Sequence, residues 1–286
     1  MGASHLPPAT QGAARPAAAG SAGARAGARA VSALFELRDV TMRFGGLTAL
    51  NRFSMQVEAG SIHALIGPNG AGKSTVFNCV SRFCMPQRGE IFFDSRPLLA
   101  EPAHRIVQLG IARTFQNIEQ LHRMTVLETV LVGLTSRTPR YFSFAPGATR
   151  ARAERRAVEE AEEILSQTAL IGFRDTLAGE LDFGRQKLLD LARALASRPR
   201  LLLLDEPAAG LRNREISFVD SILVNLARER GITIVLVEHV MQLVMSVADR
   251  VTVLSFGEKL AEGAPSAIRA DSKVVEAYLG SEAAHA

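Results

Sequence analysis

The stretch HALIGPNGAGKSTVFNCV (63–80) constrains the fold of this chain more than any other segment. An apolar run, HALI, is followed by a glycine-rich loop and then by a helical pattern. The loop fits the pattern G-x-x-x-x-G-K-[ST], in which inward-turned backbone N–H groups surround phosphate oxygens without a Cβ in the way. The helix behind the loop also offers its N-terminus to an anion. The stretch therefore predicts a strand, a phosphate-binding loop and a helix, in that order.

Two side chains of this loop carry specific chemistry. Lys73 supplies a cation for the β- and γ-phosphates of a nucleotide, and the Ser74 hydroxyl can ligate Mg²⁺. The bare pattern occurs by chance in about one chain in a hundred of this length, but the strand and helix around it argue against chance. We expect the phosphate site to consist of Gly67, Pro68, Asn69, Gly70, Ala71, Gly72, Lys73, Ser74 and Thr75.

A second apolar run, LLLLDEP (201–207), ends in two carboxylates. Ligands bind outside the carboxyl ends of the strands in a parallel sheet, so Asp205 and Glu206 are expected beside the phosphate loop. Asp205 can hold Mg²⁺, and Glu206 can orient and polarise an attacking water. Taken alone, the run would be interpreted as two exposed carboxylates that cap the turn before Pro207; together with the phosphate loop it predicts a nucleotide site.

His239 and Gln116 are weaker candidates for the same site. His239 ends the run ITIVLVEH, where a third strand would deliver a side chain to the γ-phosphate as a hydrogen-bond donor or proton relay. Gln116, in RTFQN (113–117), has an amide that could reach the metal or the water. Both assignments depend on the two motifs above, because a lone His after a strand is more often structural.

Apolar patterns alternate between strands and helices along the chain. They predict strands at 35–44, at 54–67 with a turn at Ala59-Gly60, at 91–95, at 201–204 and at 232–237, and helices after Lys73, at 103–110 and over much of 123–172. Runs that are apolar on both sides suit a buried parallel sheet, so we expect an α/β fold with a helical insertion in the middle. No uncharged apolar run reaches about 18 residues, the length that predicts a membrane-spanning helix.

The net charge of +4 gives little support to a nucleic-acid partner because of where the charge lies. Residues 1–33 carry three arginines and no acidic residue, which leaves +1 for the rest of the chain. This segment is rich in Ala, Gly, Pro and Ser, and we expect a disordered tail, with a transit peptide as the alternative. Cys79 and Cys84 fit neither metal-ligand nor redox spacing, which favours a reduced, cytosolic chain.

The stretch LDFGRQKLLDLARAL (181–195) combines an ordinary helix with an unusual start. One face of the predicted helix is formed by Leu188, Leu191, Ala192 and Leu195, at spacings of three and four. Asp182 stands where such a helix should begin, and Gly184 follows it. The start therefore fits either a simple helix cap or a segment that points at a ligand.

Together these motifs resemble those of the nucleotide-binding subunits of ATP-binding cassette (ABC) transporters, over about residues 34–281. GPNGAGKST is similar to the family's phosphate loop, LDFGRQ (181–186) to its signature, LLLLDEP to its magnesium strand and AAGL (208–211) to the loop after that strand. Gln116 matches the glutamine loop, His239 the switch histidine and Phe44 the aromatic that stacks on adenine. The alternative for Phe44 is a core Phe on an edge strand.

The resemblance implies an α/β fold: a P-loop NTPase core with an antiparallel β subdomain and a helical signature subdomain at about 117–186. It leaves tails at 1–33 and 282–286 on either side of the ATP-binding domain. It also implies that two such subunits sandwich two ATP molecules with Mg²⁺, each site joining one subunit's phosphate loop to the other's signature. In this chain the signature contacts would come from Asp182, Phe183, Gly184 and Arg185.

A finer resemblance is to the ATP-binding subunits that energise branched-chain amino acid import. It is carried by FGGLTALN (44–51), RTFQN, MTVLETVLVG (124–133), DEPAAGL (205–211), VEHVMQLVM (237–245) and the tail GEKLAEGAP…VVEAYLG. It implies two transmembrane permease subunits, a second ATP-binding subunit and, indirectly, a substrate-binding protein as partners, with no nucleic acid. The expected place is the cytoplasmic face of the bacterial inner membrane, where the chain would be peripheral.

Other classes stay open as alternatives. The ATPases of urea or amide importers and of lipopolysaccharide export are similar to this chain. A soluble ABC ATPase of DNA repair or of the ribosome usually has two cassettes or a long coiled coil, which this sequence lacks. A plain P-loop kinase would explain the phosphate loop but not the signature, Gln116 and His239 together.

The signature departs from the family pattern. The family commonly has a small hydroxyl residue or Pro at Asp182, glycine at Phe183 and glutamine at Arg185. A carboxylate about 4 Å from the γ-phosphate would cost about 4 kcal/mol per unit of phosphate charge, whereas a helix N-terminus returns only about 0.3–1 kcal/mol. We therefore predict that Asp182 turns inward as an N-cap and accepts from the amide of Gly184 or Arg185, with Arg185 offsetting its charge. The competing hypothesis is a weakened site that relies on a partner subunit with a better signature.

Overall fold

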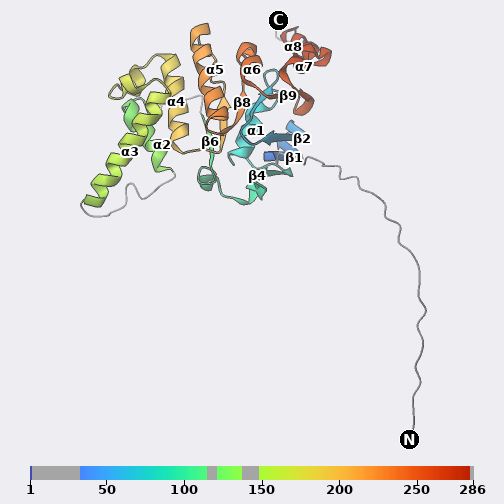
Figure 1. Cartoon of the computed structure of the whole chain (residues 1–286). Helices are drawn as coiled ribbons and strands as arrows, with labels where there is room; N and C mark the ends of the chain where they lie inside the picture. The colour runs from blue at the N-terminus through green and yellow to red at the C-terminus, as the bar shows by residue number, and fades with distance from the viewer. Residues whose placement is uncertain (2–32, 115–120, 137–147, 284–286) are drawn as a thin grey trace, which may run out of the picture. The chain divides into compact units, whose positions relative to one another are not determined.

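Two β-sheets form the frame of the protein in this computed structural model (Figure 1). The structure describes Met1 and residues 33–114, 121–136 and 148–283. Within these residues the larger sheet has six strands in the order β10-β9-β3-β8-β7-β6, and the smaller sheet has four in the order β2-β1-β4-β5. The order of the larger sheet brings β3 and β7 to either side of β8, so three segments that are distant in the sequence end side by side.

The larger sheet is parallel except at one edge. Its strands are β3 (Ile62–Ile66), β6 (Ile111–Arg113), β7 (Leu201–Asp205), β8 (Thr233–Val237), β9 (Arg250–Ser255) and β10 (Glu258–Gly263). Only β10 runs antiparallel to its neighbour, β9. Alternate residues of β7 bury on opposite faces: Leu201 and Leu203 join one core cluster, and Leu202 and Leu204 join another. This two-sided burial explains why the strand is apolar throughout.

The smaller sheet is antiparallel and packs against the first helix. Its strands are β1 (Ala33–Phe44), β2 (Leu47–Glu58), β4 (Arg88–Phe93) and β5 (Arg96–Pro97). Phe35 and Phe53 from this sheet share a core cluster with Phe77 of α1 (Lys73–Val80) and with Leu203 of β7. The cluster fixes α1 between the two sheets, with its N-terminal end next to the loop that leaves β3.

The remaining helices lie along the larger sheet or in an insertion beside it. They are α2 (Val126–Thr135), α3 (Ala148–Gln167), α4 (Phe183–Ala196), α5 (Asn213–Arg228), α6 (Met241–Val247), α7 (Pro265–Ala270) and α8 (Ser272–Ala283). Single 3₁₀ turns occur at Leu98–Ala100, Ala103–Arg105, Ile171–Phe173 and Ala178–Glu180. α2 and α3 pack beside α4 (Figure 1). A capping box starts α2, because Thr125 and Glu128 each accept from the other's backbone N–H.

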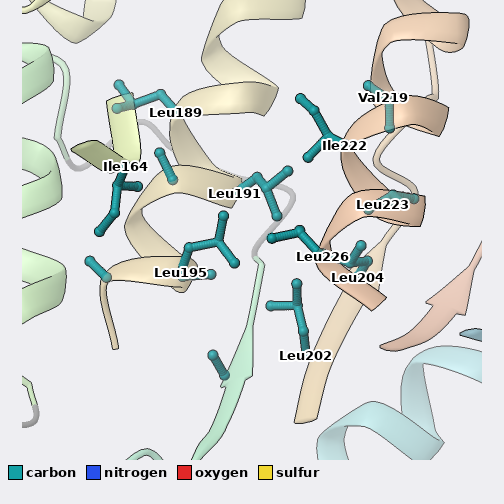
Figure 2. Packing of buried hydrophobic residues seen from close by; sticks show 14 of the residues in the cluster. Ile164, Leu189, Leu191, Leu195, Leu202, Leu204, Val219, Ile222, Leu223 and Leu226 are labelled. Carbon is teal, nitrogen blue, oxygen red and sulfur yellow. The ribbon is translucent and has the colours of Figure 1, made fainter. Parts of the chain in front are cut away.

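Figure 2 shows the core between α4, α5 and β7. Leu191 and Leu195 of α4 lie opposite Leu226 of α5, and Leu202 of β7 lies below them. All of these side chains are buried. The apolar stripe predicted from the sequence therefore holds α4 against the sheet and fixes the position of its first turn, where Asp182 lies.

The structure confirms the α/β class, the antiparallel sheet and the helical insertion, and it corrects two strands and one helix. The strand expected at 91–95 is β4, Arg88–Phe93, which ends before a turn in which Asp94 and Ser95 have positive φ angles. The second strand begins at Leu47 rather than at residue 54, because it pairs with β1 along almost its whole length. The helix expected at 103–110 is a single 3₁₀ turn followed by irregular turns that end at Gly110, whose φ of 96° no regular helix permits. None of the helices that the structure describes combines the length and apolar character needed to cross a bilayer.

Three predictions fall on residues that the structure does not describe. Gln116 lies outside the described residues. The predicted tail at 1–33 also lies outside them, apart from Met1 and residue 33. Of the predicted tail at 282–286, only 282 and 283 belong to the described chain, as the end of α8.

Candidate nucleotide site

The loop between β3 and α1 is shaped by glycines. Gly67 has a φ of 151°, and a Cβ there would lie 2.0 Å from the carbonyl oxygen of Leu254. Gly72 has a φ of 109°, and its Cβ would lie 2.4 Å from the carbonyl oxygen of Ala49. Neither position accommodates a side chain without moving a backbone segment. The loop can therefore follow this path, with its amides turned inward, only with glycine at both positions.

Lys73, the first residue of α1, folds back over the loop. Its Nζ donates to the carbonyl oxygens of Gly67 at 2.7 Å and Pro68 at 2.9 Å. The ammonium is buried, and burial lowers the pKa of Lys73, an effect that the nearby carboxylates of Glu206 and Asp205 oppose. The loop thus already holds a cation where an anion would bind, and phosphate oxygens can replace the two carbonyls as its acceptors.

The N-terminus of α1 is open to a ligand. Gly72 is its N-cap, and within the described part of the chain no side chain caps it. No acidic residue occurs in its first turn, and Ser74 is exposed there. The first amides of the helix are consequently available to an anion.

Asp205 ends β7 at the edge of the sheet next to this loop. Its Oδ2 lies 3.0 Å from Nη2 of Arg113, and Arg113 also donates to Asn78 of α1 at 2.8 Å. The other carboxylate oxygen, Oδ1, is buried and makes no hydrogen bond with the residues that the structure describes. A buried carboxylate oxygen without a partner and a hydroxyl at Ser74 fit Mg²⁺, which typically takes one or two protein oxygens together with phosphate and water.

Glu206 follows in a strained backbone conformation. Its φ of 51° lies in the left-handed region, which non-glycine residues rarely adopt. Two hydrogen bonds hold it there: its N–H donates to Val237 of β8 at 2.8 Å, and its carbonyl accepts from Nζ of Lys187 at 2.5 Å. Its carboxylate lies 3.2 Å from Nε2 of His239, the second residue after the end of β8.

The first turn of α4 satisfies its own hydrogen bonds. Oδ1 of Asp182 accepts from the backbone N–H of Arg185 at 2.9 Å, and Oδ2 accepts from the guanidinium of the same residue. That guanidinium also lies 4.4 Å from the ring centre of Phe173. The predicted cap is confirmed, with Arg185 rather than Gly184 as the donor. Asp182 thus directs its carboxylate along its own helix.

Comparisons with known proteins agree with this geometry. The family model described as ABC transporter matches residues 50–209, more than half of the chain. The chain belongs to the ABC transporter family. A second model, described as Branched-chain amino acid ATP-binding cassette transporter, matches residues 258–284. This ABC protein is therefore an ATP-binding, ATP-hydrolysing subunit, and its fold is that of the family's cassettes.

The match to this ABC ATPase extends over nearly the whole length of its curated relatives. BraF of Pseudomonas aeruginosa, a high-affinity branched-chain amino acid transport ATP-binding protein, is 41% identical over 249 residues, or 86% of this chain and 98% of BraF. LivG of Escherichia coli, with the same description, is 37% identical over the same shares. The solved ADP conformation of an ABC transporter's ATP-binding cassette matches with a TM-score of 0.76 and 31% identity, covering 87% of this chain and 99% of that one. A dimeric bacterial ABC transporter cassette matches with a TM-score of 0.70 and 25% identity, covering 81% of this chain and 98% of that one.

The cassette brings together most of the residues that the sequence singled out. Lys73, Asp205, Glu206 and His239 meet at the carboxyl ends of β3, β7 and β8. Phe44 ends β1 with 49% of its surface exposed, and β1 is flanked by β2 and β4. The alternative of a core Phe on an edge strand is therefore wrong.

Sequence reasoning missed three residues of this ABC site: Arg113, which pairs with Asp205, and also Lys187 and Glu238. Lys187 lies on α4, four residues before the buried Leu191, and no sequence pattern marks it as a hydrogen-bond partner of Glu206. Glu238 is buried at the end of β8, and neither carboxylate oxygen makes a hydrogen bond with the described residues. Burial raises the pKa of Glu238 to about 7, helped by the charge of Glu206 and opposed by Lys187 and nearby backbone amides. An acidic residue at the end of an apolar run, directly before His239, was the signal that could have identified it.

Proposed function

We propose that this chain powers the import of branched-chain amino acids through separate membrane subunits. The substrate class follows from the names of relatives such as BraF and LivG and from the C-terminal family model at 258–284. The hydrolytic role rests above all on one observation, the 3.2 Å approach of the Glu206 carboxylate to His239 beside the glycine loop. Neither feature alone would define a transporter ATPase; the combination supports one.

ATP would bind along the loop at 67–75. Backbone amides of the loop and of α1 surround the β- and γ-phosphates, and Lys73 exchanges its two carbonyl partners for phosphate oxygens. Phe44, exposed at the end of β1, offers its ring to adenine. Ser74, Asp205 and Gln116 would hold Mg²⁺, which neutralises charge on the phosphates when bound.

Hydrolysis would depend on Glu206 and His239. The Glu206 carboxylate orients the attacking water and accepts its proton, while its backbone is fixed by Val237 and Lys187. His239, whose Nε2 lies 3.2 Å from the Glu206 carboxylate, can donate a hydrogen bond to the γ-phosphate or to Glu206. Gln116 is proposed to orient the same water or the metal.

A second ATP-binding subunit would complete each site. In the proposed dimer, residues 182–185 of one subunit face the γ-phosphate held by the loop of the other, through the Gly184 amide and the first turn of α4. The match to a dimeric bacterial cassette supports this arrangement. Because Asp182 is tied to Arg185, its carboxylate need not oppose the phosphate. ATP binding would close the dimer, and hydrolysis would reopen it.

A hollow on the cassette suits a permease segment. It has a volume of about 290 Å³ and lies between the end of α1, the strand β6, α2 and α4. Its rim includes Phe83 and Val132, which are exposed apolar residues, and its wall includes the small residues Gly133, Ala194 and Ser197. Exposed apolar side chains around a concavity favour a protein partner. We propose that short cytoplasmic helices of the two permease subunits dock on the cassettes here, where the helical subdomain of about 117–186 borders the rest of the 34–281 domain. This docking would hold the subunit at the cytoplasmic face of the membrane.

Hydrolysis and binding can be separated in the transporter reconstituted with its permease. The Glu206→Gln subunit should bind ATP with wild-type affinity and hydrolyse it more than about a hundred-fold more slowly, because the amide cannot accept the proton. Glu229→Gln, at the exposed end of α5, serves as the control and should behave as wild type. Full turnover by the Glu206→Gln transporter would reject the proposed mechanism. ATP-dependent uptake of labelled leucine, but not of urea, tests the substrate class.

A further inference from the structure

The two cysteines of the chain come together at the far end of the phosphate-loop helix. Sγ of Cys79, in the last turn of α1, lies 3.5 Å from Sγ of Cys84. Both are free thiols. Their spacing of five residues does not by itself indicate a redox pair, since neither a helix nor a strand brings such positions together.

The backbone explains the pairing independently of the side chains. α1 ends in a Schellman motif: the N–H of Phe83 donates to the carbonyl of Asn78 at 2.9 Å, and the N–H of Arg82 donates to that of Cys79 at 3.2 Å. Arg82 adopts the left-handed conformation that this motif requires, with a φ of 62°. Its guanidinium Nε donates to the carbonyl of Glu101 at 3.0 Å, which secures the turn. The chain therefore reverses at Arg82 and folds Cys84 back over Cys79.

The two thiols differ in their surroundings. Cys79 is fully buried in the core cluster of α1, and burial raises its pKa well above the usual range. Cys84 is only partly buried. An oxidant from solution reaches Cys84 first, and the buried thiol is then in position to resolve the product.

We propose that Cys79 and Cys84 are a reversible redox pair that forms an intrachain disulfide when the protein meets hydrogen peroxide. Peroxide oxidises the Cys84 thiol to a sulfenic acid and is itself reduced to water. The Cys79 sulfur then attacks the sulfenic sulfur; the S–O bond breaks, an S–S bond forms, and the thiol proton leaves with the hydroxyl as a second water. The sulfurs need only approach from 3.5 Å to the S–S bond length of about 2.05 Å.

The disulfide would act on a surface that matters for coupling. Ser81 and Phe83 lie between the two cysteines and line the hollow of about 290 Å³ described above. Closing the S–S bond pulls this turn inward and changes how Phe83 is presented. This consequence, unlike the disulfide itself, rests on the proposed docking of the permease there.

Tryptic mapping of the full-length subunit tests the disulfide. Cleavage after Arg82 places the cysteines in different peptides, 74–82 and 83–88, which stay joined only through an S–S bond. We expect a joined pair, about 2 Da lighter than the two peptides together, after peroxide treatment of the folded protein and its loss after a dithiol reductant. The joined pair should be absent in Cys79→Ser and Cys84→Ser, and Cys79→Ser should instead accumulate a sulfenic acid at Cys84 that dimedone traps. Unlinked peptides from the peroxide-treated wild type, or linkage no faster than in urea-unfolded chain, would overturn the proposal.

The effect on docking is measured separately, with the permease subunits. Reduced wild type should bind them at least about five-fold more tightly than oxidised wild type, and Cys84→Ser should bind equally under both conditions. If the reduced subunit fails to bind at all, the docking surface is wrong, whereas the peptide map still decides the fate of the thiol pair. Equal binding by reduced and oxidised wild type would reject the effect on coupling.

Discussion

The N-termini of α1 and α4 present the same kind of electrostatic site in two different states. At α1 the cap is Gly72, no described side chain covers the first turn, and Lys73 stands beside the open amides. At α4 the cap is Asp182, whose carboxylate already accepts from the Arg185 backbone and side chain. Both ends carry the partial positive charge of a helix dipole. One end is left open for an external anion, and the other is satisfied by an internal one.

This difference indicates how much each helix N-terminus can contribute to phosphate binding. The α1 end can hold phosphate by itself, because among the described residues only the two carbonyl contacts of Lys73 have to be displaced. The α4 end offers only what Asp182 leaves unused, chiefly the Gly184 amide. We infer that nucleotide affinity resides in the loop at 67–75 and that the signature adds a smaller term when a dimer closes.

The largest expected effect comes from a Cβ at the start of α1. Gly72→Ala forces an L-residue to a φ of 109° and places its Cβ 2.4 Å from a backbone oxygen, so the loop must rearrange. We expect ATP affinity to fall by more than about a hundred-fold and stability to fall by about 2–4 kcal/mol.

The matched change at the other helix is Gly184→Ala. Its Cβ would lie 3.1 Å from Oε1 of Glu215, the end of a side chain whose other oxygen accepts from the Arg212 N–H, and alanine is the better helix former by about 0.5–1 kcal/mol. Stability should therefore stay the same or rise slightly. Nucleotide titration and thermal denaturation measure both variants; equal losses would remove the distinction between the two ends.

The buried carboxyl beside Lys187 gives the next effect, through pH. Glu238 has a pKa of about 7 in the folded protein against an ordinary value of 4.5, so the native state keeps a proton that the unfolded chain has lost. Its contribution to stability is fully present below pH 4.5 and is lost as pH rises through 7. The stability of wild type relative to Glu238→Gln should fall by about 2–3 kcal/mol between pH 5 and pH 8. Urea unfolding across this range checks it, and a flat difference would contradict the assignment.

Each helix also carries one lysine that interacts with Glu206, Lys73 through its charge and Lys187 through a hydrogen bond. Substitution of the two should have different effects. Lys73→Met removes the cation of the phosphate site and should weaken ATP binding by about a hundred-fold. Lys187→Met removes the hydrogen bond to the Glu206 carbonyl and should lower kcat by about ten-fold with ATP affinity unchanged. Binding by isothermal titration and turnover in the reconstituted transporter separate the two. A large loss of affinity in Lys187→Met would place both lysines in one binding site.

The smallest effect is expected at the cap of α4. Serine and asparagine cap helices about as well as aspartate, so Asp182→Ser and Asp182→Asn should change stability by less than about 0.5 kcal/mol. Because the carboxylate is held along its own helix, transporter turnover should change by less than about two-fold. A ten-fold or larger gain in both variants would mean that the charge at Asp182 opposes the nucleotide and that the signature is weakened.

Some of this site could be predicted from the sequence because its chemistry depends on local spacing. The glycine loop, Asp205 and Glu206 sit at fixed positions relative to apolar strands, and those strands could be recognised by their composition. The class of fold followed from the same alternation of strands and helices.

Other features depend on contacts that no local pattern encodes. Arg113 reaches Asp205 because β6 and β7 pair in register, and Lys187 reaches Glu206 because the stripe on α4 fixes the helix against the sheet. Cys84 meets Cys79 through a left-handed Arg82, whose conformation is common in glycine and rare in arginine. Sequence reasoning fails where a long-range register or an unfavourable backbone conformation determines the contact.

The hydrogen bond from Lys187 to Glu206 has a consequence for a pair of such subunits. Lys187 belongs to the helix whose start would face the partner's nucleotide, and Glu206 belongs to the subunit's own proposed catalytic centre. A shift of α4 when its first turn contacts the partner's ATP would therefore alter the hydrolysis of the ATP in its own subunit. By linkage, any effect of one site on nucleotide binding at the other is reciprocal. A single bond with a charged donor contributes about 1.5 kcal/mol, which limits the cooperativity it can carry to about ten-fold.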